Sequence, residues 1–420
     1  MNFKTLFKYK KAFASFGQLA IGEFSSRVFA FLTSIYLART LGADGFGLVG
    51  FVGTIASFFI LFSNFGIEQY SAQQLSSIDI PAQSSLIKTV IGARLFLATF
   101  FVIVFIGFGF LYAHTESEFY FFLFQSLLIF AFAFNLQFYF VARKKIKALS
   151  FLRSGTSLAI LLGSIAFVTK ASDLPKVALV SGVITLTLFL LSVAWVFSNT
   201  RQNVTLPKYR EIVTLVKHAA PLGISALMIQ IYHSADIVFL GFTNPGVELG
   251  YYTGAYRIVN VLSIIPGIFY LIFLPDLAKI SSDFFSAIAT RTYVLTLICC
   301  GTLVTAGCYF FSGQLISLLL GTSYLPALHV FSILLINVFL IFVNVSLAHL
   351  LIAWNQHKKY LVVVSLGALT NIVCNIILIP RYGIIGAAIA TVCAECAVLL
   401  TSVYYHHRLH GLFASKEPAG

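Results

Sequence analysis

A few ionisable side chains interrupt the long apolar runs of this sequence. Glu23 and Arg27 are four residues apart, the spacing of one helical turn, so the two can form an ion pair. Four further charges lie in separate apolar runs: Arg94, Asp236, Arg257 and Glu395. A charge within a bilayer costs at least about 2.5 to 3.5 kcal/mol on insertion scales, so such residues pair with one another or line a path for a substrate or an ion.

Several of these charges also have a structural explanation. Glu23 and Arg27 can serve only as an ion pair that holds helices in place. Arg94 lies near one end of its apolar run, so its long side chain can reach the membrane interface. Asp236 lies close to the connection at residues 243–249, where it can cap a helix or form part of an external gate. Amides in the later runs are more typical of interhelical hydrogen bonds than of ligand binding: Asn337, Asn344, Asn371 and Asn375.

The composition determines which elements must position these residues. Of the 420 residues, 59% are hydrophobic and 10% are charged, and the mean hydropathy is +0.95. Ordinary soluble domains have about 25% charged residues, so no soluble core of this length could bury so much apolar surface. These values exclude a soluble enzyme, a disordered regulator and a collagen-like fibre, and they predict a polytopic membrane protein.

The apolar runs predict an all-α fold with about twelve transmembrane helices. A helix needs roughly 20 apolar residues to cross a bilayer core, and the runs show no period of two that would indicate a barrel. The predicted spans are residues 12–38, 45–66, 87–113, 119–142, 150–169, 177–198, 214–242, 248–275, 291–312, 326–353, 358–379 and 383–406.

Basic residues concentrate on one side of this predicted topology. With the N-terminus inside the cell, 20 of the 27 Lys and Arg residues fall in cytoplasmic loops or helix ends, and 4 fall on the opposite side. The positive-inside rule therefore places both termini in the cytoplasm. Topology explains the net charge of +13, so we expect contact with membrane lipids and no nucleic-acid partner.

A weak internal repeat divides the chain into halves. Superposing Gly45-Phe46-Gly47, in the segment Leu37–Phe51, on Gly250-Tyr251-Tyr252, in the segment Ser234–Ile258, gives an offset of 205 residues. Since each half has an even number of predicted helices, both halves have the same membrane orientation, as in parallel transporter repeats. Two such bundles can enclose a cavity that opens to either side, which predicts an alternating-access transporter. We therefore expect two six-helix bundles, residues 1–205 and 206–420.

The sequence has no motif for catalysis, ATP binding or metal binding. It contains no G-x-x-x-x-G-K-[ST] phosphate loop, no H-E-x-x-H and no G-x-S-x-G. Cys393 and Cys396 form a C-x-x-C, but they lie in an apolar run and are better explained as small buried residues. We therefore expect a protein that is not an enzyme and that needs no cofactor or metal. Glycosyl transfer by intramembrane carboxylates remains an alternative.

Several helix connections together resemble those of a known family. They read LARTLGADGFGLVGF (37–51), DIVFLGF followed by GVELGYYTGAYRI (236–258), LLIAWNQHKKY (350–360) and IPRYGIIGAAIAT (379–391). This set resembles the polysaccharide exporters of the multidrug/oligosaccharidyl-lipid/polysaccharide exporter superfamily, and within it the Wzx-like O-antigen flippases. The resemblance extends over essentially the whole chain and includes a plan of twelve helices in two bundles.

The resemblance implies a flippase that moves an undecaprenyl-pyrophosphate-linked oligosaccharide across the bacterial inner membrane. A polysaccharide polymerase and a chain-length regulator would be its partners. Guanidinium groups suit bidentate contact with the pyrophosphate, and the candidates are Arg27, Arg94 and Arg257. Asn260 and Tyr256 are candidate sugar contacts. Because no ATP motif is present, a proton or sodium gradient would drive transport, with Glu23, Asp236 and Glu395 as the candidate coupling residues.

Two other functions compete with the flippase. A cation-coupled multidrug exporter would have the same fold but would favour an acidic cavity, and the three intramembrane arginines argue against one. An integral-membrane polymerase or glycosyltransferase would be an enzyme, usually with a large outer loop that this sequence lacks.

Overall fold

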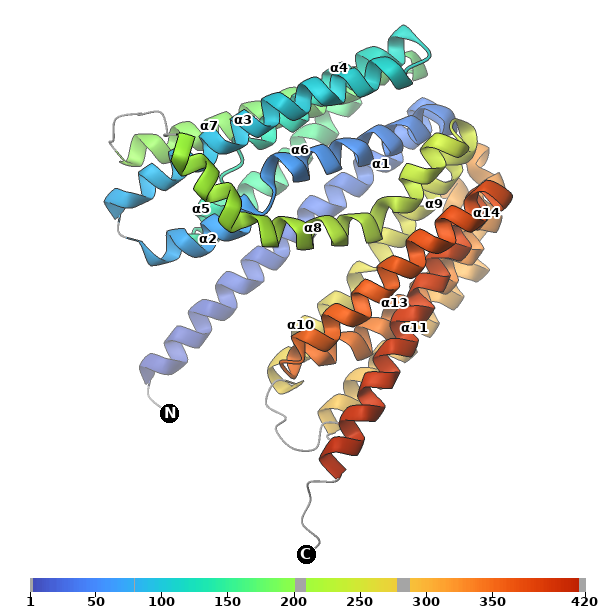
Figure 1. The fold of residues 1–420 in the computed structure, drawn as a ribbon. Coiled ribbons are helices and arrows are strands. Elements are labelled where there is room, and N and C mark those ends of the chain that lie inside the picture. The colour runs from blue at the N-terminus through green and yellow to red at the C-terminus, as the bar shows by residue number, and fades with distance from the viewer. Residues whose placement is uncertain (1–2, 79, 201–208, 278–287, 415–420) are drawn as a thin grey trace, which may run out of the picture. The chain divides into compact units, whose positions relative to one another are not determined.

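A computed structural model describes residues 3–78, 80–200, 209–277 and 288–414 of the protein (Figure 1). Within these ranges every regular element is a helix, so the predicted all-α fold is confirmed. The first half contains α1 (Phe3–Asn64), α2 (Ile67–Ser77), α3 (Ile80–Tyr112), α4 (Glu116–Phe132), α5 (Gln137–Ala142), α6 (Ile146–Phe167), the 3₁₀ turn η1 (Ala171–Asp173) and α7 (Leu174–Thr200). The second half contains α8 (Tyr209–Thr243), α9 (Val247–Leu262), α10 (Ile264–Leu277), α11 (Ile288–Phe310), α12 (Ser312–Leu319), η2 (Thr322–Ala327), α13 (Leu328–Ala353) and α14 (His357–Ala414).

Ten of the described helical segments are long and apolar enough to cross a membrane. Two of the ten, Gly22–Ser77 and His357–Arg408, each cover two of the spans predicted from sequence. Gly42 (φ 73°) in α1 and Gly383 (φ 54°) in α14 leave the helical conformation, in a region that favours glycine because it has no Cβ. The protein is thus a multi-pass membrane protein. The count of twelve crossings and the cytoplasmic location of both termini stay predictions.

Contacts between Cα atoms divide the chain into two compact units. Unit 1 comprises Met1–Leu41 and Val52–Leu227, and unit 2 comprises Gly42–Phe51 and Met228–Gly420. The predicted boundary between residues 205 and 206 lies outside the described residues, so the division into bundles 1–205 and 206–420 stays a prediction.

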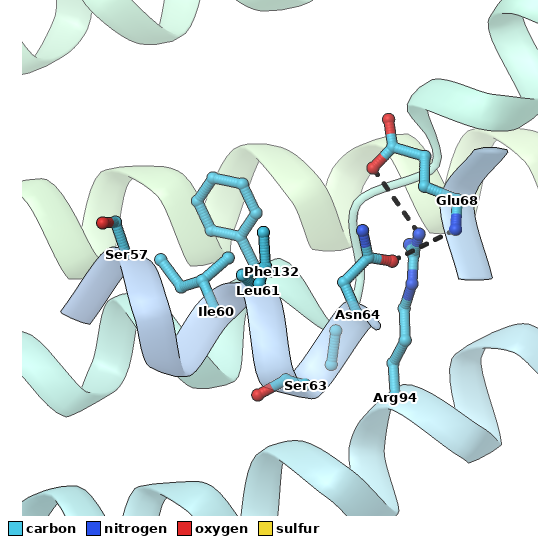
Figure 2. Close-up of a pocket in the computed structure, with 9 residues that line it drawn as sticks. Ser57, Ile60, Leu61, Ser63, Asn64, Glu68, Arg94 and Phe132 are labelled. Carbon is cyan, nitrogen blue, oxygen red and sulfur yellow. Dashed lines mark hydrogen bonds and ion pairs between the residues drawn. The ribbon is translucent and has the colours of Figure 1, made fainter. Parts of the chain in front are cut away.

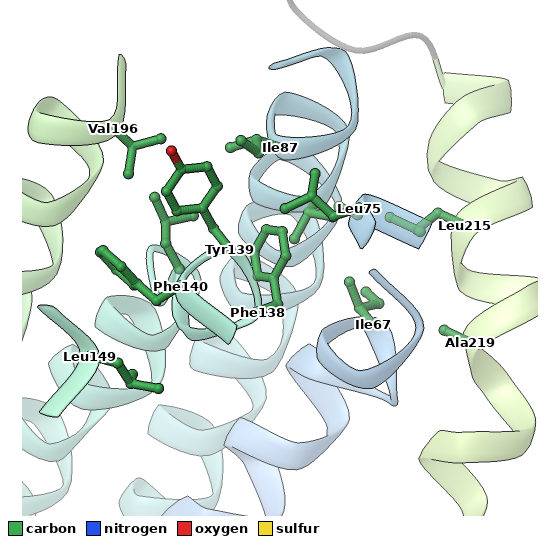
Figure 3. Packing of buried hydrophobic residues seen from close by; sticks show 13 residues of the cluster. Ile67, Leu75, Ile87, Phe138, Tyr139, Phe140, Leu149, Val196, Leu215 and Ala219 are labelled. Atoms are coloured by element: carbon green, nitrogen blue, oxygen red, sulfur yellow. The ribbon is translucent and has the colours of Figure 1, made fainter. Parts of the chain in front are cut away.

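A buried apolar cluster in unit 1 fixes the short helix α5 (Figure 3). Phe138, Tyr139 and Phe140 are consecutive on α5 and are all at least 94% buried. They pack with residues of α2, α3 and α6–α8, among them Ile67 and Leu149. Burial of large aromatic side chains is a major contribution to packing, so this cluster holds the start of α5 at a defined position.

A break between α1 and α2 rests directly on the backbone of α8. Phe65 (φ 32°) and Gly66 (φ 79°) both have left-handed backbone conformations. A Cβ on Gly66 would collide with the carbonyl oxygen of Ala219 and the amide nitrogen of Gly223, so only glycine fits there. This close approach sets the direction in which α2 leaves α1 and thereby places Glu68, near the start of α2.

The two segments of the predicted repeat meet in unit 2. A Cβ on Gly250 of α9 would overlap the backbone of Ala43, and one on Gly241 of α8 would overlap the ring of Phe51. The Phe51 ring also packs edge-on against Phe242, with 5.4 Å between ring centroids. Gly241 and Gly250 therefore allow a close helix–helix contact with residues 43–51, as small residues do in membrane bundles.

Candidate functional site

A cluster of three charged side chains lies on α1 and α6 in unit 1. The Nε atom of Arg27 lies 3.1 Å from Oε1 of Glu23, which confirms the ion pair predicted from their spacing. Arg153 of α6 pairs through Nη1 with the other carboxylate oxygen of Glu23. Two guanidinium groups thus share one carboxylate, so the cluster keeps an excess positive charge. The Arg27 side chain is 53% exposed and that of Arg153 is 29% exposed, so an anion can approach both.

Small residues bring α6 close enough to α1 for this contact. The Ser154 hydroxyl donates to the carbonyl oxygen of Gly22 at 2.9 Å, and the hydroxyls of Ser26 and Ser157 lie 2.7 Å apart. Serine and glycine allow close approach of membrane helices and provide hydrogen bonds across the contact. These bonds follow Arg153 directly along α6 and hold its side chain beside Glu23.

Sequence reasoning missed Arg153, which is one of the 20 basic residues that the predicted topology assigns to the cytoplasmic side. The residue lies near the start of a predicted span, where the positive-inside rule explains a basic side chain without any function. A signal was present in the sequence nevertheless. Ser150, Ser154 and Ser157 repeat at helical spacing and mark a polar face next to Arg153.

Arg94 of α3 lies buried inside unit 1 (Figure 2). Its side chain is only 2% exposed. Nη1 donates to the carbonyl oxygen of Asn135 at 2.6 Å, and Nη2 lies 3.6 Å from Oε2 of Glu68. The guanidinium carbon lies 5.5 Å from the centroid of the Phe138 ring, a cation–π contact. The group borders a pocket of about 170 Å³ that Ser57, Ser63, Asn64 and Glu68 also line.

Asp236 of α8 is buried in unit 2, and the donors to its carboxylate among the described residues are uncharged. The Tyr252 hydroxyl and the backbone amide of Ile237 (2.9 Å) both donate to its carboxylate. Tyr252 in turn stacks on Tyr256 with 5.7 Å between ring centroids. The hydroxyl of Tyr256 donates to the carbonyl oxygen of His233 at 3.3 Å. The carboxylate of Asp236 therefore faces α9 within the protein.

Glu395 of α14 has a similar environment elsewhere in unit 2. The Tyr232 hydroxyl donates to Oε1 at 2.8 Å, and Nδ2 of Asn344 donates to Oε2 at 2.5 Å. Asn344 thus forms the interhelical hydrogen bond expected of it, between α13 and α14. By contrast, Asn375 and Asn371 bond each other at 2.9 Å within α14 itself. Within the ranges that the structure describes, neither Glu395 nor Asp236 forms a salt bridge.

Arg257 and Asn260 lie on α9 with exposed side chains, three residues apart on the helix. They therefore face the same side of α9. Tyr256, which precedes Arg257, is partly exposed. The structure thus brings these three predicted substrate contacts together on one helix of unit 2, whereas Arg27 and Arg94 lie in unit 1.

The charged residues do not form a metal centre in the part of the chain that the structure describes. No group of three or more His, Cys, Asp or Glu side chains there could hold an ion. The arrangement instead offers paired guanidinium groups to an anion in unit 1, and carboxylates with neutral partners in unit 2.

Comparison with known proteins gives the family and the fold. A family model described as polysaccharide biosynthesis protein matches residues 13–280, whereas no curated protein matches the chain. A structure of the lipid II flippase MurJ in an inward closed conformation aligns with a TM-score of 0.76 at 16% identity, over 93% of this chain and 87% of that chain. An inward-facing multidrug resistance MATE transporter of the MOP superfamily aligns with a TM-score of 0.62 at 13% identity, over 93% and 96% of the two chains.

A variant of the Vibrio cholerae MATE transporter VcmN has the same architecture, with a TM-score of 0.55 at 15% identity over 96% of this chain and 97% of that chain. At these identities the structural matches show the fold alone, and that fold is one of transporters and flippases. The family model covers well over half of the sequence and confirms the resemblance to polysaccharide exporters. The chain therefore belongs to the polysaccharide biosynthesis protein family.

Proposed function

We propose that the protein is a flippase that moves an undecaprenyl-pyrophosphate-linked oligosaccharide across the bacterial inner membrane by alternating access. The observation that carries this proposal is the cluster of Glu23, Arg27 and Arg153, in which two guanidinium groups share one carboxylate within apolar helices. A pyrophosphate head group cannot enter hydrocarbon unaided, because burial of unpaired charge is very unfavourable. Guanidinium groups lower this barrier because they form bidentate hydrogen bonds with phosphate oxygens.

The remaining site residues fit the same proposal. Arg257, Asn260 and Tyr256 share the exposed side of α9, where they would contact the pyrophosphate or the sugars. Two names support the substrate class: the family is one of polysaccharide biosynthesis, and a structural relative is a lipid II flippase. A polysaccharide polymerase and a chain-length regulator would act on the flipped product.

An ion gradient would drive the transport cycle. Asp236 and Glu395 are the coupling residues that we favour, because each carboxylate is bonded by neutral donors and can accept a proton or a sodium ion without displacing an arginine. Glu23, the third candidate, is already shared by two guanidinium groups. Binding of an ion to Glu23 would therefore compete with both arginines.

Reconstitution tests the flippase directly. Purified protein in liposomes would receive a fluorescent polyprenyl-pyrophosphate oligosaccharide, and a membrane-impermeant quencher would report the fraction on the outer leaflet. We expect protein-dependent flipping that Arg27→Gln and Arg257→Gln abolish, with normal protein levels and, in cells, loss of surface polysaccharide. Lys176→Gln is a matched control, because Lys176 is an exposed cation of α7 outside the proposed site. Flipping at the wild-type rate in both arginine variants would overturn the site assignment.

A cation-coupled multidrug exporter is the second candidate. The buried carboxylate of Asp236 and the fold shared with MATE transporters favour it. The same liposomes loaded with ethidium distinguish the two functions. Gradient-driven ethidium export without lipid flipping would support the exporter, whereas flipping without export supports the flippase.

A further inference from the structure

Arg94 and the charged cluster of α1 and α6 are joined by an unbroken series of polar contacts. The series begins where α4 ends at Phe132 and the chain turns before α5 starts at Gln137. The carbonyl oxygen of Asn135 in this turn accepts from Nη1 of Arg94 at 2.6 Å. A hydrogen bond from an ionised donor is stronger than a neutral one, and at 93% burial Asn135 cannot replace it readily with water.

The side chain of Asn135 connects this turn to the start of α5. Its Oδ1 atom accepts from the backbone amide of Gln137 at 2.9 Å, a local Asx turn that sets the direction of the first residue of α5. Oε1 of Gln137 then accepts from Nε of Arg153 at 3.2 Å. Arg153 completes the series through its ion pair with Glu23. The backbone carbonyl and Oδ1 of Asn135, together with Oε1 of Gln137, thus link the two arginines.

The contacts of Arg94 show which bond fixes its position. Nη2 lies 3.6 Å from Glu68, beyond hydrogen-bond distance, and neither Nη2 nor Nε has a hydrogen-bond partner among the described residues. Arg94 and Glu68 both line the pocket of about 170 Å³, which has room for water molecules beside the pair (Figure 2). Glu68 therefore neutralises Arg94, while the bond to Asn135 determines where the guanidinium group points.

We propose that Arg94 is a positioning residue that acts through Asn135 and Gln137 to hold Arg153 in the orientation in which it binds a pyrophosphate-bearing substrate with Arg27. This inference rests on the proposed function, because it makes Arg153 a substrate ligand. It changes the role of Arg94, which the sequence suggested as a direct pyrophosphate ligand. The buried guanidinium group of Arg94 thus acts on the substrate through the partly exposed Arg153.

Chemical labelling of Arg153 tests the proposed series independently of transport. Full-length protein in detergent would be treated with phenylglyoxal, which modifies accessible arginines, and labelling of Arg153 would be measured by mass spectrometry. Gln137→Ala removes the acceptor of Arg153, and Arg94→Met removes the donor to Asn135. We expect each variant to raise the labelling rate about fivefold, the effect of losing one typical hydrogen bond.

Two controls separate positioning from general loosening of the fold. Gln137→Glu keeps an acceptor for Arg153, so we expect labelling at the wild-type rate. Gln125→Ala makes the same change as Gln137→Ala at a buried glutamine of α4 outside the series, and it should also leave labelling unchanged. If Arg94→Met fails to fold, Gln137→Ala with its two controls still decides the outcome. Labelling within twofold of wild type in Gln137→Ala would overturn the proposal.

Binding of inorganic pyrophosphate to the same samples, measured by calorimetry, separates this inference from the proposed function. If Arg27→Gln and Arg153→Gln weaken binding and Gln137→Ala weakens it only when Arg153 is present, both proposals are supported. If Arg27→Gln and Arg153→Gln bind pyrophosphate as wild type does, the proposed function fails even where labelling shows the series. Equal effects of Gln137→Ala with and without Arg153 would overturn the positioning role alone.

Discussion

The two compact units of the chain treat their intramembrane carboxylates differently. In unit 1, Glu23 pairs with two arginines and Glu68 faces Arg94 at 3.6 Å. In unit 2, Asp236 and Glu395 accept hydrogen bonds from tyrosine, asparagine and backbone donors, all of them neutral. Both units are helical and apolar, so the contrast lies in the partners of the acids.

This difference suggests that the carboxylates of the two units have different roles in transport. A carboxylate held by two guanidinium groups orients them and leaves positive charge for an anion. A carboxylate held by neutral donors keeps its own charge uncompensated, which in an apolar surrounding favours uptake of a proton or a metal cation. We therefore expect Glu23 of unit 1 to orient arginines for the anionic part of the substrate, and the two acids of unit 2 to respond to the ion gradient.

The largest effect should follow from removing positive charge in unit 1. Arg153→Gln takes one of the two guanidinium groups from Glu23, and we expect the flipping rate in liposomes to fall on the order of 30-fold or more. Arg153→Lys keeps the charge but loses the forked pair of donors, so its flipping rate should fall by less than that of Arg153→Gln. A wild-type flipping rate in Arg153→Gln would contradict this contrast between the units, because transport would then not need the paired arginines of unit 1.

The next effect concerns the ion gradient. Glu395→Gln and Asp236→Asn remove the charge of each acid and keep its shape, so we expect transport that no longer accelerates under an imposed proton or sodium gradient. Glu23→Gln should keep its gradient response although its overall rate falls. Flipping rates with and without the gradient measure this, and loss of the response only in Glu23→Gln would reverse the assignment of the two units.

A smaller effect is expected on stability when tyrosine hydroxyls are removed. Tyr252→Phe deletes a donor to the carboxylate of Asp236 and should cost about 1.5 to 3 kcal/mol of unfolding free energy. Tyr36→Phe in unit 1 deletes a donor to the neutral carbonyl of Val168 (2.7 Å) and should cost about 0.5 to 1.5 kcal/mol. Denaturation in detergent measures the unfolding free energies of the two variants. Equal losses would indicate that Asp236 is not ionised.

The smallest effects should differ in sign between the units. Ser26→Ala removes the hydrogen bond to Ser157 between α1 and α6, and we expect a loss of about 0.6 kcal/mol. Ser402 of α14 is fully buried, and its hydroxyl has no hydrogen-bond partner among the described residues. Ser402→Ala should therefore leave the melting temperature unchanged or raise it. A marked decrease would reveal an internal water that bonds this hydroxyl.

Much of the fold could be predicted from the sequence because few backbone structures can span a bilayer. Backbone groups in hydrocarbon must be bonded within the segment, so each apolar run had to be a helix. The predicted span at 150–169, for example, corresponds to α6 at Ile146–Phe167. The pairing of Glu23 with Arg27 was also predictable, since it depends only on the spacing within one helix.

Other parts of the site could not be predicted, because they depend on contacts between helices. Arg153 reaches Glu23 across 130 positions of sequence, and the contact exists only because serines and Gly22 let α6 approach α1. The break at Phe65 and Gly66 is likewise fixed by the backbone of α8, far along the chain. No local pattern carries such information.

By itself, the sequence determined that this protein is a helical, multi-pass membrane protein with a few charges inside its spans, because hydrophobicity and helix periodicity are local properties. Only the tertiary structure decided which charges meet. It paired Glu23 with two arginines, placed neutral donors beside Asp236 and Glu395, and buried Arg94 against the turn at Asn135. The physical reason is that the energy of a charge in an apolar medium depends on its neighbours within a few ångströms, and helix packing chooses those neighbours.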